Sequence, residues 1–591
     1  MIKLAHIHIT QYKNLANLDI PINGSFDCKL SDDNELTINM RENTSTYYNG
    51  TYCSAIIGKN GVGKTTILDF VENFLINSHA IGIMIFFQEQ WGKFHILDPY
   101  NLIKNVKSKY KHTISTNAKK FARDYSLNIL KVNNLSNIEK VLTHRKENRS
   151  VLISNKSISR LNNASKKQKS EHFHRISDYL YGSNSIDKVG KSKIGYMIEV
   201  KQPTIYGVLK KPPFEKLFET YNENEEIEKY KYRFNKSKKN EIGLIEKQDF
   251  PRDNNDLSII DVWKEKSTYE YQGILNNTEH LFNHFLIPIT LFTIGESNIE
   301  KSAHIQLSSM VIEEYMTSFV KFDGLPHNHY PPTELLKNSF RSAIDKALSF
   351  NLIKEDRGYD IQHSLYELTI KLDSIIDITR NEKSSNFYIT SDNKIVISDY
   401  EHLTNAIEAI ESLPKQISSH ITYGWEGISS GEMAKINIFS EIHAHINNNC
   451  IDNSIIIIDE ADLYLHPEWQ RTFLYELISL VTKNCKHKMN QIIITTHSPI
   501  IISDFLPNDI VSLDKDSNDS TYVKKSLGFG TNISNLFIDE MHISSTFGEH
   551  SRLTIEKLLS RFESDEMLDG DDFLISQIGN KHMREYLKSN D

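Results

Sequence analysis

The chain has 591 residues, of which 39% are hydrophobic and 25% are charged, and its formal net charge is −9. The length suggests several lobes. The most apolar run, residues 286–294, is about half as long as a membrane-spanning helix and contains Pro288, which excludes a membrane-transport role within this chain. The opening MIKLAHIHITQYKNL alternates apolar and polar residues, as a strand does, and lacks the continuous apolar core of a signal peptide. Four cysteines without CxxC spacing predict reduced thiols in a cytoplasmic protein.

Residues 1–100 are predicted to form strands that lead into a Gly-rich loop and a helix. A short apolar strand, SAII, precedes GKNGVGKT at residues 58–65, which matches GxxxxGK[ST] at every fixed position. Such a loop turns its backbone N–H groups toward phosphates, and the helix N-terminus adds a favourable dipole. The pattern predicts that Lys64 reaches the β- and γ-phosphates of a nucleotide and that Thr65 binds Mg²⁺. The other expected nucleotide contacts are Gly58, Asn60, Gly61, Gly63 and Thr66.

Residues 101–254 are predicted to form a basic insertion. Residues 101–250 contain 32 Lys and Arg against 16 Asp and Glu, so the rest of the chain carries a net charge of −25. This asymmetry indicates a polyanionic partner, and the aromatic residues among the cations of 229–234 would allow stacking on unpaired nucleic-acid bases. A solvated lobe that contacts acidic parts of a complex explains the same composition, so both interpretations remain open.

Residues 255–420 are predicted to be a helical lobe, because apolar residues recur at helical spacing in 310–320 and 365–376. A strand is expected at 394–398. From 421 to 540 strands and helices alternate as in an α/β sheet, and 541–591 are expected to form a helical tail. The two α/β portions are expected to build one nucleotide-binding sheet. The predicted fold class is therefore an α/β head interrupted by a long, mainly helical, basic insertion.

Two buried strands in the C-terminal portion end in residues with chemical roles. Four isoleucines at 455–458 indicate a parallel strand buried on both faces, and Asp459 and Glu460 follow it. Adjacent carboxylates at such a strand end favour a bound cation. We expect Asp459 to hold Mg²⁺, directly or through water, and Glu460 to act as general base on the attacking water. The strand QIIITTH ends in His497, which would reach the γ-phosphate.

A helix start lies 30 residues before Asp459, at ISSGE in residues 428–432. Ser429 or Ser430 is predicted to cap this helix, with Glu432 in its first turn. Helix starts are common, and the spacing to the acidic pair makes this one distinctive.

GKNGVGKT, ISSGE, IIIIDE and TTHSP together resemble the motifs of ABC-type ATPases, in the branch of recombination and chromosome-maintenance ATPases. The resemblance implies a head-to-tail homodimer, in which Ser429 and the Gly431 backbone of one copy contact the γ-phosphate held by Lys64 of the other. The chain departs from the LSGGQ signature of that family at Ser430 and Glu432.

The Q-loop glutamine of the family has no clear counterpart in this sequence. Gln88 and Gln90 lie in an expected hairpin, and the Ser154-Asn155 region is a second candidate.

A narrower resemblance lies in ADLYLHPEWQR at 461–471, FGTNISNLF at 529–537 and TFGE at 546–549, which are similar to segments of Septu anti-phage ATPases, including the form carried beside retrons. It covers roughly 1–75 and 421–591. It implies an HNH-type nuclease as a separate partner. In the retron form it also implies a reverse transcriptase with its RNA–DNA product.

The expected function is that of an ATP-hydrolysing subunit that gates a partner nuclease through head dimerisation. A DNA repair or recombination ATPase is the alternative, and a scaffold that holds ATP as a structural ligand is a third hypothesis. No nuclease is expected within the chain. The sequence contains no convincing His–Asn–His arrangement, and the acidic residues at 569–572 are interpreted as a turn before the last helix.

Overall fold

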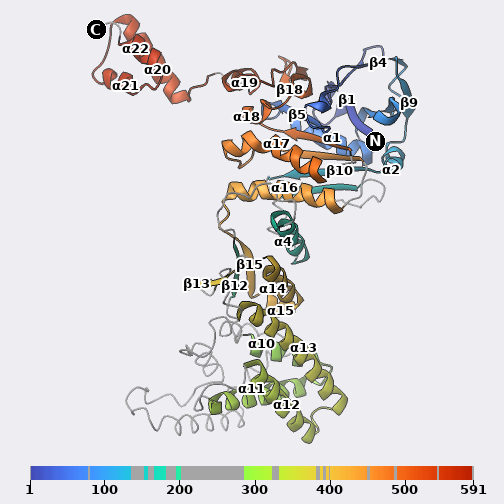
Figure 1. Cartoon of the computed structure of the whole chain (residues 1–591), viewed down its shortest axis with the longest axis vertical. Coiled ribbons are helices and arrows are strands. Elements are labelled where there is room, and N and C mark those ends of the chain that lie inside the picture. Colours follow the sequence, from blue (N-terminus) through green and yellow to red (C-terminus); the bar gives the residue numbers. More distant parts are fainter. Residues whose placement is uncertain are drawn as a thin grey trace. The chain divides into compact units, whose positions relative to one another are not determined.

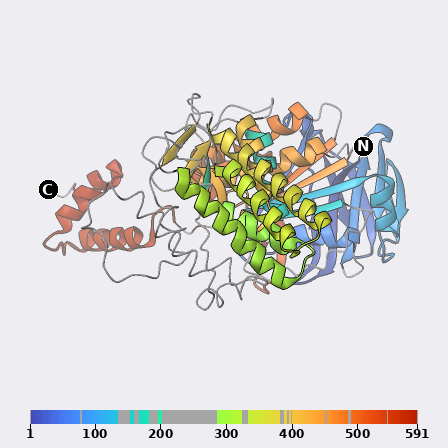
Figure 2. The same cartoon turned by 90° about the horizontal axis from the view of Figure 1, so that it is seen from below.

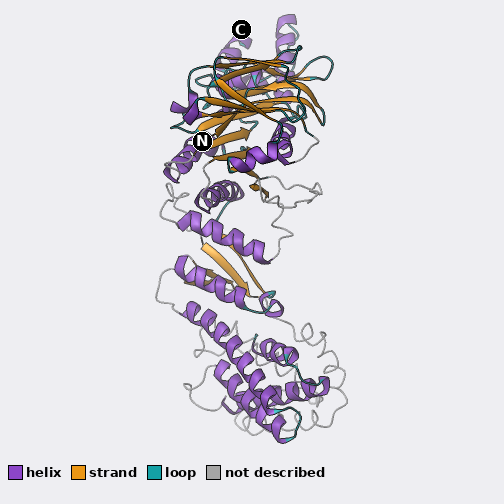
Figure 3. Ribbon diagram, turned by 90° about the vertical axis from the view of Figure 1, so that its right-hand side faces the viewer, coloured by secondary structure: helices purple, strands orange, loops and turns teal. Residues whose placement is uncertain are grey.

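The computed structural model forms two units: a head unit of residues 1–188 and 429–591, and a helical unit of residues 189–428. Figure 1 labels the elements of both units. The strands of the head unit are gathered in one region (Figure 3). The structure describes residues 2–76, 80–134, 152–157, 166–181, 195–200, 285–322, 332–380, 387–390, 394–397, 400–448, 453–484, 489–541, 543 and 545–588.

The head unit is built on a seven-stranded sheet with the order β11-β10-β16-β17-β5-β18-β19. All neighbouring strands are parallel except the β18–β19 pair, which is antiparallel. This confirms that the two ends of the chain build one sheet. Its strands are β5 (Tyr52–Gly58), β10 (Leu127–Asn133), β11 (Leu152–Ser157), β16 (Asn453–Asp459), β17 (Met489–Thr495), β18 (Ile510–Lys515) and β19 (Thr521–Lys524).

Alternate side chains of this sheet enter two separate cores. Ile455 and Ile457 of β16 pack in the same core as helix α1 (Lys64–Ile76). Ile456 and Ile458 pack in the core of helices α16 (Ser430–Asn448) and α17 (Pro467–Asn484). Helices therefore cover both faces of the sheet, which explains why the isoleucine run is continuous instead of alternating with polar residues.

A five-stranded sheet, β2-β1-β6-β7-β9, and a three-stranded sheet, β3-β4-β8, complete the head. The side chain of Gln491 in β17 bonds to both the N–H and the carbonyl of Leu4 in β1, at 2.8 Å each. The strands are β1 (Ile2–Tyr12), β2 (Leu15–Ile20), β3 (Phe26–Leu30), β4 (Glu35–Met40), β6 (Ile81–Gln88), β7 (Lys93–Leu97), β8 (Asn105–Ser108) and β9 (Lys111–Ser115).

The first part of the predicted insertion belongs to the head instead. Strands β8, β9 and β10, and helix α2 (Ala118–Asp124) between them, join the sheets and the core of the head. Helix α4 (Lys166–Tyr181) packs on α16, where Arg175 pairs with Glu441 at 2.8 Å. Strand β12 (Gly195–Val200) belongs to the helical unit. Residues 201–284, which include the aromatic and basic cluster at 229–234, lie outside the described residues.

The helical unit contains the helices predicted at 310–320 and 365–376 and the strand predicted near 394. Helices α11 and α12 lie side by side (Figure 2). Its antiparallel sheet has the order β13-β14-β12-β15. The elements are α10 (Leu286–Glu296), α11 (Lys301–Phe322), α12 (Pro332–Ser349), α13 (Glu355–Arg380), β13 (Phe387–Thr390), β14 (Lys394–Ile397), α14 (Tyr400–Ser412), α15 (Lys415–Ser418) and β15 (Ile421–Glu426).

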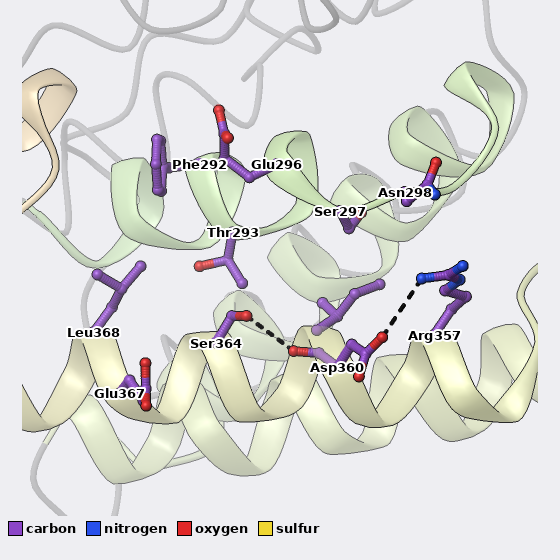
Figure 4. A pocket seen from close by; sticks show the side chains of 11 residues that line it. Phe292, Thr293, Glu296, Ser297, Asn298, Arg357, Asp360, Ser364, Glu367 and Leu368 are labelled. Carbon is purple, nitrogen blue, oxygen red and sulfur yellow. Dashed lines mark hydrogen bonds and ion pairs between the residues drawn. The ribbon is translucent and has the colours of Figure 1, made fainter.

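A cavity of about 460 Å³ lies between α10 and α13 of the helical unit (Figure 4). Thr293 and Glu296 line it from α10. From α13, Asp360 lies 3.6 Å from Arg357 and its carbonyl accepts a hydrogen bond from Ser364. Arg357, Asp360 and Ser364 are therefore paired with each other along α13.

The chain ends in helices α20 (Glu549–Ser564), α21 (Asp571–Gln577) and α22 (Lys581–Leu587), which share a small core of Leu558, Ile575 and Leu587. Asp571 pairs with Arg561 at 2.9 Å and accepts the Leu568 N–H. This carboxylate therefore fixes the turn before α21. Residues 569–572 were expected to form a turn before the last helix, whereas Asp571 and Asp572 begin α21 and a further helix, α22, follows. Among the described helices, none is both long and apolar enough for a membrane span.

We predict that Lys131 stabilises the head unit more than Lys13, although both pair with Asp69. The Lys131 Nζ lies 2.8 Å from Asp69 and 3.4 Å from Glu72, and its side chain is 5% exposed, against 52% for Lys13. Removal of a buried partner costs about 3 kcal/mol, whereas an exposed pair contributes less than about 1 kcal/mol. Urea denaturation of Lys131→Ala and Lys13→Ala measures the difference. Equal losses of unfolding free energy would contradict this prediction.

Candidate active site

The Gly-rich loop at residues 58–65 connects β5 to α1, as predicted. Gly58 and Gly63 have φ angles of +141° and +106°, which side-chain-bearing residues rarely adopt. A Cβ on Gly58 would lie 2.4 Å from the Leu513 carbonyl oxygen. The loop therefore requires glycine at these positions. Asn60, Gly61 and Thr65 are exposed along it, while Thr66 is half-buried.

The Lys64 side chain folds back over this loop. Its Nζ donates hydrogen bonds to the carbonyl oxygens of Gly58 at 2.9 Å and Lys59 at 3.2 Å. Burial lowers the pKa of Lys64, and nearby carboxylates, Glu460 first among them, oppose this shift by favouring the charged ammonium. A cation enclosed by the Gly-rich loop and acidic side chains suits the binding of a phosphate chain.

Asp459 joins the ends of three elements at the carboxyl edge of the sheet. It is 1% exposed and accepts hydrogen bonds from the Thr495 hydroxyl at 2.6 Å and the Thr65 hydroxyl at 3.4 Å. Thr65 and Asp459 are 394 residues apart in the sequence. A hydroxyl and a carboxylate at this separation form the oxygen donor set that Mg²⁺ prefers. The residues predicted to hold the metal therefore fit it.

Glu460 lies in a left-handed turn directly after β16, with a φ of +53°. Its N–H donates to the Thr495 hydroxyl at 2.7 Å, which fixes this unfavourable backbone conformation. Burial raises the pKa of the Glu460 carboxyl, and repulsion from Asp459 raises it further. A carboxylate with a raised pKa is a stronger proton acceptor, which suits the predicted general base.

Asp462 is a site residue that the sequence analysis missed. Its Oδ1 accepts hydrogen bonds from the Thr496 hydroxyl at 2.5 Å and the His497 N–H at 2.9 Å. The segment after the acidic pair therefore anchors the loop that carries His497. Burial lowers the pKa of His497, Lys64 lowers it further, and Asp462 opposes both. These effects favour a neutral imidazole near pH 7. The available signal in the sequence was an acidic residue two positions after Glu460, in EAD at 460–462, together with the polar pattern TTH at 495–497.

The predicted signature helix begins as a reciprocal capping box. The Ser429 hydroxyl accepts the Glu432 N–H at 3.3 Å, and the Glu432 carboxylate accepts the Ser429 N–H at 2.8 Å. Ser429 is therefore the cap, and it is exposed. A Cβ on Gly431 would lie 2.7 Å from both the Trp469 ring and the Tyr464 carbonyl oxygen, so glycine allows this close packing.

The three Q-loop candidates do not converge on Asp459. Gln88 ends β6 in the five-stranded sheet of the head and bonds to His95 at 2.9 Å. Gln90 lies in the 3₁₀ turn Glu89–Trp91 of the same hairpin. Ser154 and Asn155 lie on β11, which β10 separates from β16.

Known proteins resemble the region that contains much of this site. Residues 425–503 match the family described as "AAA domain, putative AbiEii toxin, Type IV TA system". The matched range includes Ser429, the acidic pair and His497. A mixed α/β unit with a parallel sheet fits such an ATPase domain.

Several curated proteins are similar over short stretches. The Septu protein PtuA of Bacillus thuringiensis is 33% identical over 97 residues, 16% of this chain and 23% of that protein. The Old nuclease of Escherichia phage P2 is 29% identical over 137 residues, 23% of this chain and 21% of that protein. The retron Vc95 probable ATPase of Vibrio cholerae serotype O1 biovar El Tor is 28% identical over 142 residues, 21% of this chain and 26% of that protein.

These similarities confirm the resemblance to ABC/AAA-type ATPases related to defence systems. The chain matches 26% or less of the length of each of these relatives. Because one of them is named a nuclease, the expected absence of a nuclease from this chain remains a prediction.

We predict that Glu460→Gln lowers the rate of ATP hydrolysis at saturating ATP by at least about a hundredfold, because an amide cannot accept the proton of the attacking water. Nucleotide affinity should change little. Glu468→Gln is the matched control, because Glu468 is exposed at the start of α17 and pairs with Arg471. Phosphate release and binding of a fluorescent ATP analogue measure the two effects. Normal turnover in Glu460→Gln would rule out this general base.

We further predict that Asp462→Ala lowers the turnover number about tenfold or more, because two hydrogen bonds to a charged acceptor are lost and the His497 loop loses its anchor. KM for ATP should change much less than kcat. Asp516→Ala, in the exposed turn after β18, is the control. A parallel loss of kcat and thermal stability in both variants would instead indicate general destabilisation.

Proposed function

We propose that this chain binds and hydrolyses ATP with Mg²⁺ as a subunit of a bacterial anti-phage defence system, in which two copies pair head to tail and gate a separate nuclease. The support for ATP hydrolysis is the convergence of Lys64, Thr65, Asp459, Glu460 and His497 at one edge of the parallel sheet. The support for the defence role is the similarity to PtuA and to the retron Vc95 probable ATPase.

Each residue of the site has a role that follows from its surroundings. The Gly-rich loop and Lys64 would bind the phosphates, and Thr65 and Asp459 would hold Mg²⁺, which neutralises charge on the phosphate oxygens when bound. Glu460, with its raised pKa, accepts a proton from the attacking water. His497, placed by Asp462, donates a hydrogen bond toward the γ-phosphate end of the site.

The signature residues support the proposed dimer. Ser429 and Ser430 are exposed at the N-terminus of α16, where the helix dipole favours a phosphate. Ser429 and Gly431 of one copy would thus close the nucleotide site of the second copy. ATP then acts as the bridging ligand, and its hydrolysis removes the group that both copies contact.

The partners remain proposals. An HNH-type nuclease is the proposed effector, with a reverse transcriptase and its RNA–DNA product as further components. Residues 101–250 are the proposed nucleic-acid contact, because they contain 32 Lys and Arg residues against 16 Asp and Glu residues. Such binding should weaken steeply as the salt concentration rises.

The deciding experiment is the mass of complexes that co-purify with the chain expressed from its native locus. Wild type and Glu460→Gln are compared with and without ATP, and Glu468→Gln serves as the control. We expect an ATP-dependent dimer that Glu460→Gln stabilises, together with a small nuclease. A dimer without a nuclease in every condition would reject the partner and favour a stand-alone DNA repair or recombination ATPase.

A further inference from the structure

Helix α13 carries a row of exposed, mainly aromatic side chains along one side. Its members are Tyr359, His363, Tyr366 and Ile370, which follow each other at intervals of four, three and four residues. Residues at these intervals lie on the same side of a helix. The exposed fractions are 71% for Tyr359, 54% for Tyr366 and 45% for Ile370, and His363 is exposed as well. We call this set the aromatic row.

The fold of the helical unit does not require the aromatic row, because α13 packs through a different side. Ile361, Leu365, Leu368 and Leu372 are buried, with exposed fractions of 8% or less, and the helix contacts α10, α12 and α14. One apolar stripe is enough to hold a surface helix to its core. A second stripe of large exposed side chains is typical of a surface that contacts another molecule.

Carboxylates border the aromatic row on the side of α13 that faces α10. Asp360 and Glu367 each directly follow a tyrosine of the row, and both line the cavity between α10 and α13 together with Glu296 of α10 (Figure 4). Arg357 is the only cation among the described residues that line this cavity, and it lies 3.6 Å from Asp360. Glu296 and Glu367 have no ion-pair partner within the described part of the chain. The cavity therefore carries more negative than positive charge.

The charges along α13 are also negative on balance. Between residues 355 and 373 the helix contains five Asp and Glu against two Lys and Arg. A cation does reach the row from α12, where the Lys337 Nζ lies 5.3 Å from the centre of the Tyr366 ring. Its charge is already balanced, because it pairs with Glu334 at 2.7 Å and with Asp373 at 3.5 Å. The aromatic row therefore lies in a surface of net negative charge.

This combination indicates the class of molecule that the row would contact. Tyrosine rings can stack on nucleic-acid bases, but phosphates would then lie beside Asp360 and Glu367, and like charges repel. Helix α13 of a second copy carries the same excess of carboxylates and is disfavoured for the same reason. A protein helix with an apolar side and flanking Lys or Arg matches both features, because it covers the row while its cations reach the carboxylates.

We propose that the aromatic row of α13 and the acidic cavity beside it dock a basic amphipathic helix of a partner protein. The apolar side of that helix packs on Tyr359, Tyr366 and Ile370, and its Lys or Arg side chains pair with Glu367 and Glu296 at the cavity. Aromatic side chains in such a row supply much of the binding energy, while the surrounding charges set specificity and the rate of association. The docking surface belongs to the helical unit and needs no residue of the nucleotide site.

The test measures binding of synthetic peptides to the full chain by fluorescence anisotropy. The probe is a labelled helical peptide with leucine every three or four residues and lysine at flanking positions, and its counterpart carries glutamate in place of every lysine. We expect the chain to bind the lysine peptide and not the glutamate peptide. Tyr359→Ala/Tyr366→Ala should weaken this binding about tenfold or more, because large aromatic anchors dominate such contacts. Asp360→Lys/Glu367→Lys should weaken it at least about fivefold and should allow the glutamate peptide to bind, because the charges beside the row are reversed.

Two control variants carry the same kinds of change in the head unit. Tyr475→Ala removes a tyrosine of α17 that is also 71% exposed, and Glu563→Lys/Glu566→Lys reverses two exposed carboxylates near the end of α20. Both controls should bind the lysine peptide as wild type does, and every variant should keep the wild-type thermal midpoint.

Equal binding of both peptides to wild type, or equal losses in the control variants, would overturn the proposal. Displacement of the lysine peptide by a single-stranded oligonucleotide that itself loses affinity in Tyr359→Ala/Tyr366→Ala would also overturn it, because the row would then contact nucleic acid. Binding of the glutamate peptide to Asp360→Lys/Glu367→Lys alone would support it, because a general loss of structure cannot produce this gain.

Discussion

The buried carboxylate of Asp459 is the constraint on which the candidate site depends. A carboxylate with 1% exposure at the end of an isoleucine strand is stable only if donors or a cation surround it. Thr65 and Thr495 provide hydroxyl donors from two other elements. Because these three elements are β16, α1 and β17, one side chain fixes the Gly-rich loop, the acidic strand and the histidine strand relative to each other.

The segment after Asp459 extends this constraint to the rest of the site. Glu460 and Tyr464 both adopt left-handed backbone angles, with φ of +53° and +65°. Between them, Asp462 anchors the Thr496–His497 loop, and the Tyr464 carbonyl packs against Gly431 of α16. Backbone strain of this kind persists where surrounding contacts determine the conformation, and it is common at functional sites. Glu460, the histidine loop and the start of α16 are thus physically connected within one chain.

The residues with proposed chemical roles belong to only one of the two units. All the residues that we assign to phosphate, metal, base and signature roles lie in the head unit. The chain nevertheless passes from β15 of the helical unit into the cap of α16 within three residues. Along the chain, the signature helix therefore begins almost directly after the helical unit. Asn134 and Tyr464 nevertheless hold its first turns to the head.

The sequence by itself determined the elements that carry chemistry. The Gly-rich loop, the isoleucine strand and the histidine strand were predictable because glycine spacing and buried apolar runs are local signals, and the structure contains all three. The helices of the middle segment followed from apolar spacing in the same way. The Ser429 cap was one of two alternatives that the sequence left open, and the hydrogen bonds with Glu432 select it.

Only the tertiary structure decided which distant residues meet. The assignment of 105–133 to the head depends on strand pairing, which a basic composition does not reveal. The roles of Asp462 and Thr495 depend on backbone turns that bring their oxygen atoms to donors on neighbouring segments. Asn133 is not marked by any motif, and it is paired with Asp459 solely through the register of two parallel strands. Such pairings join residues hundreds of positions apart, so no local pattern in the sequence can specify them.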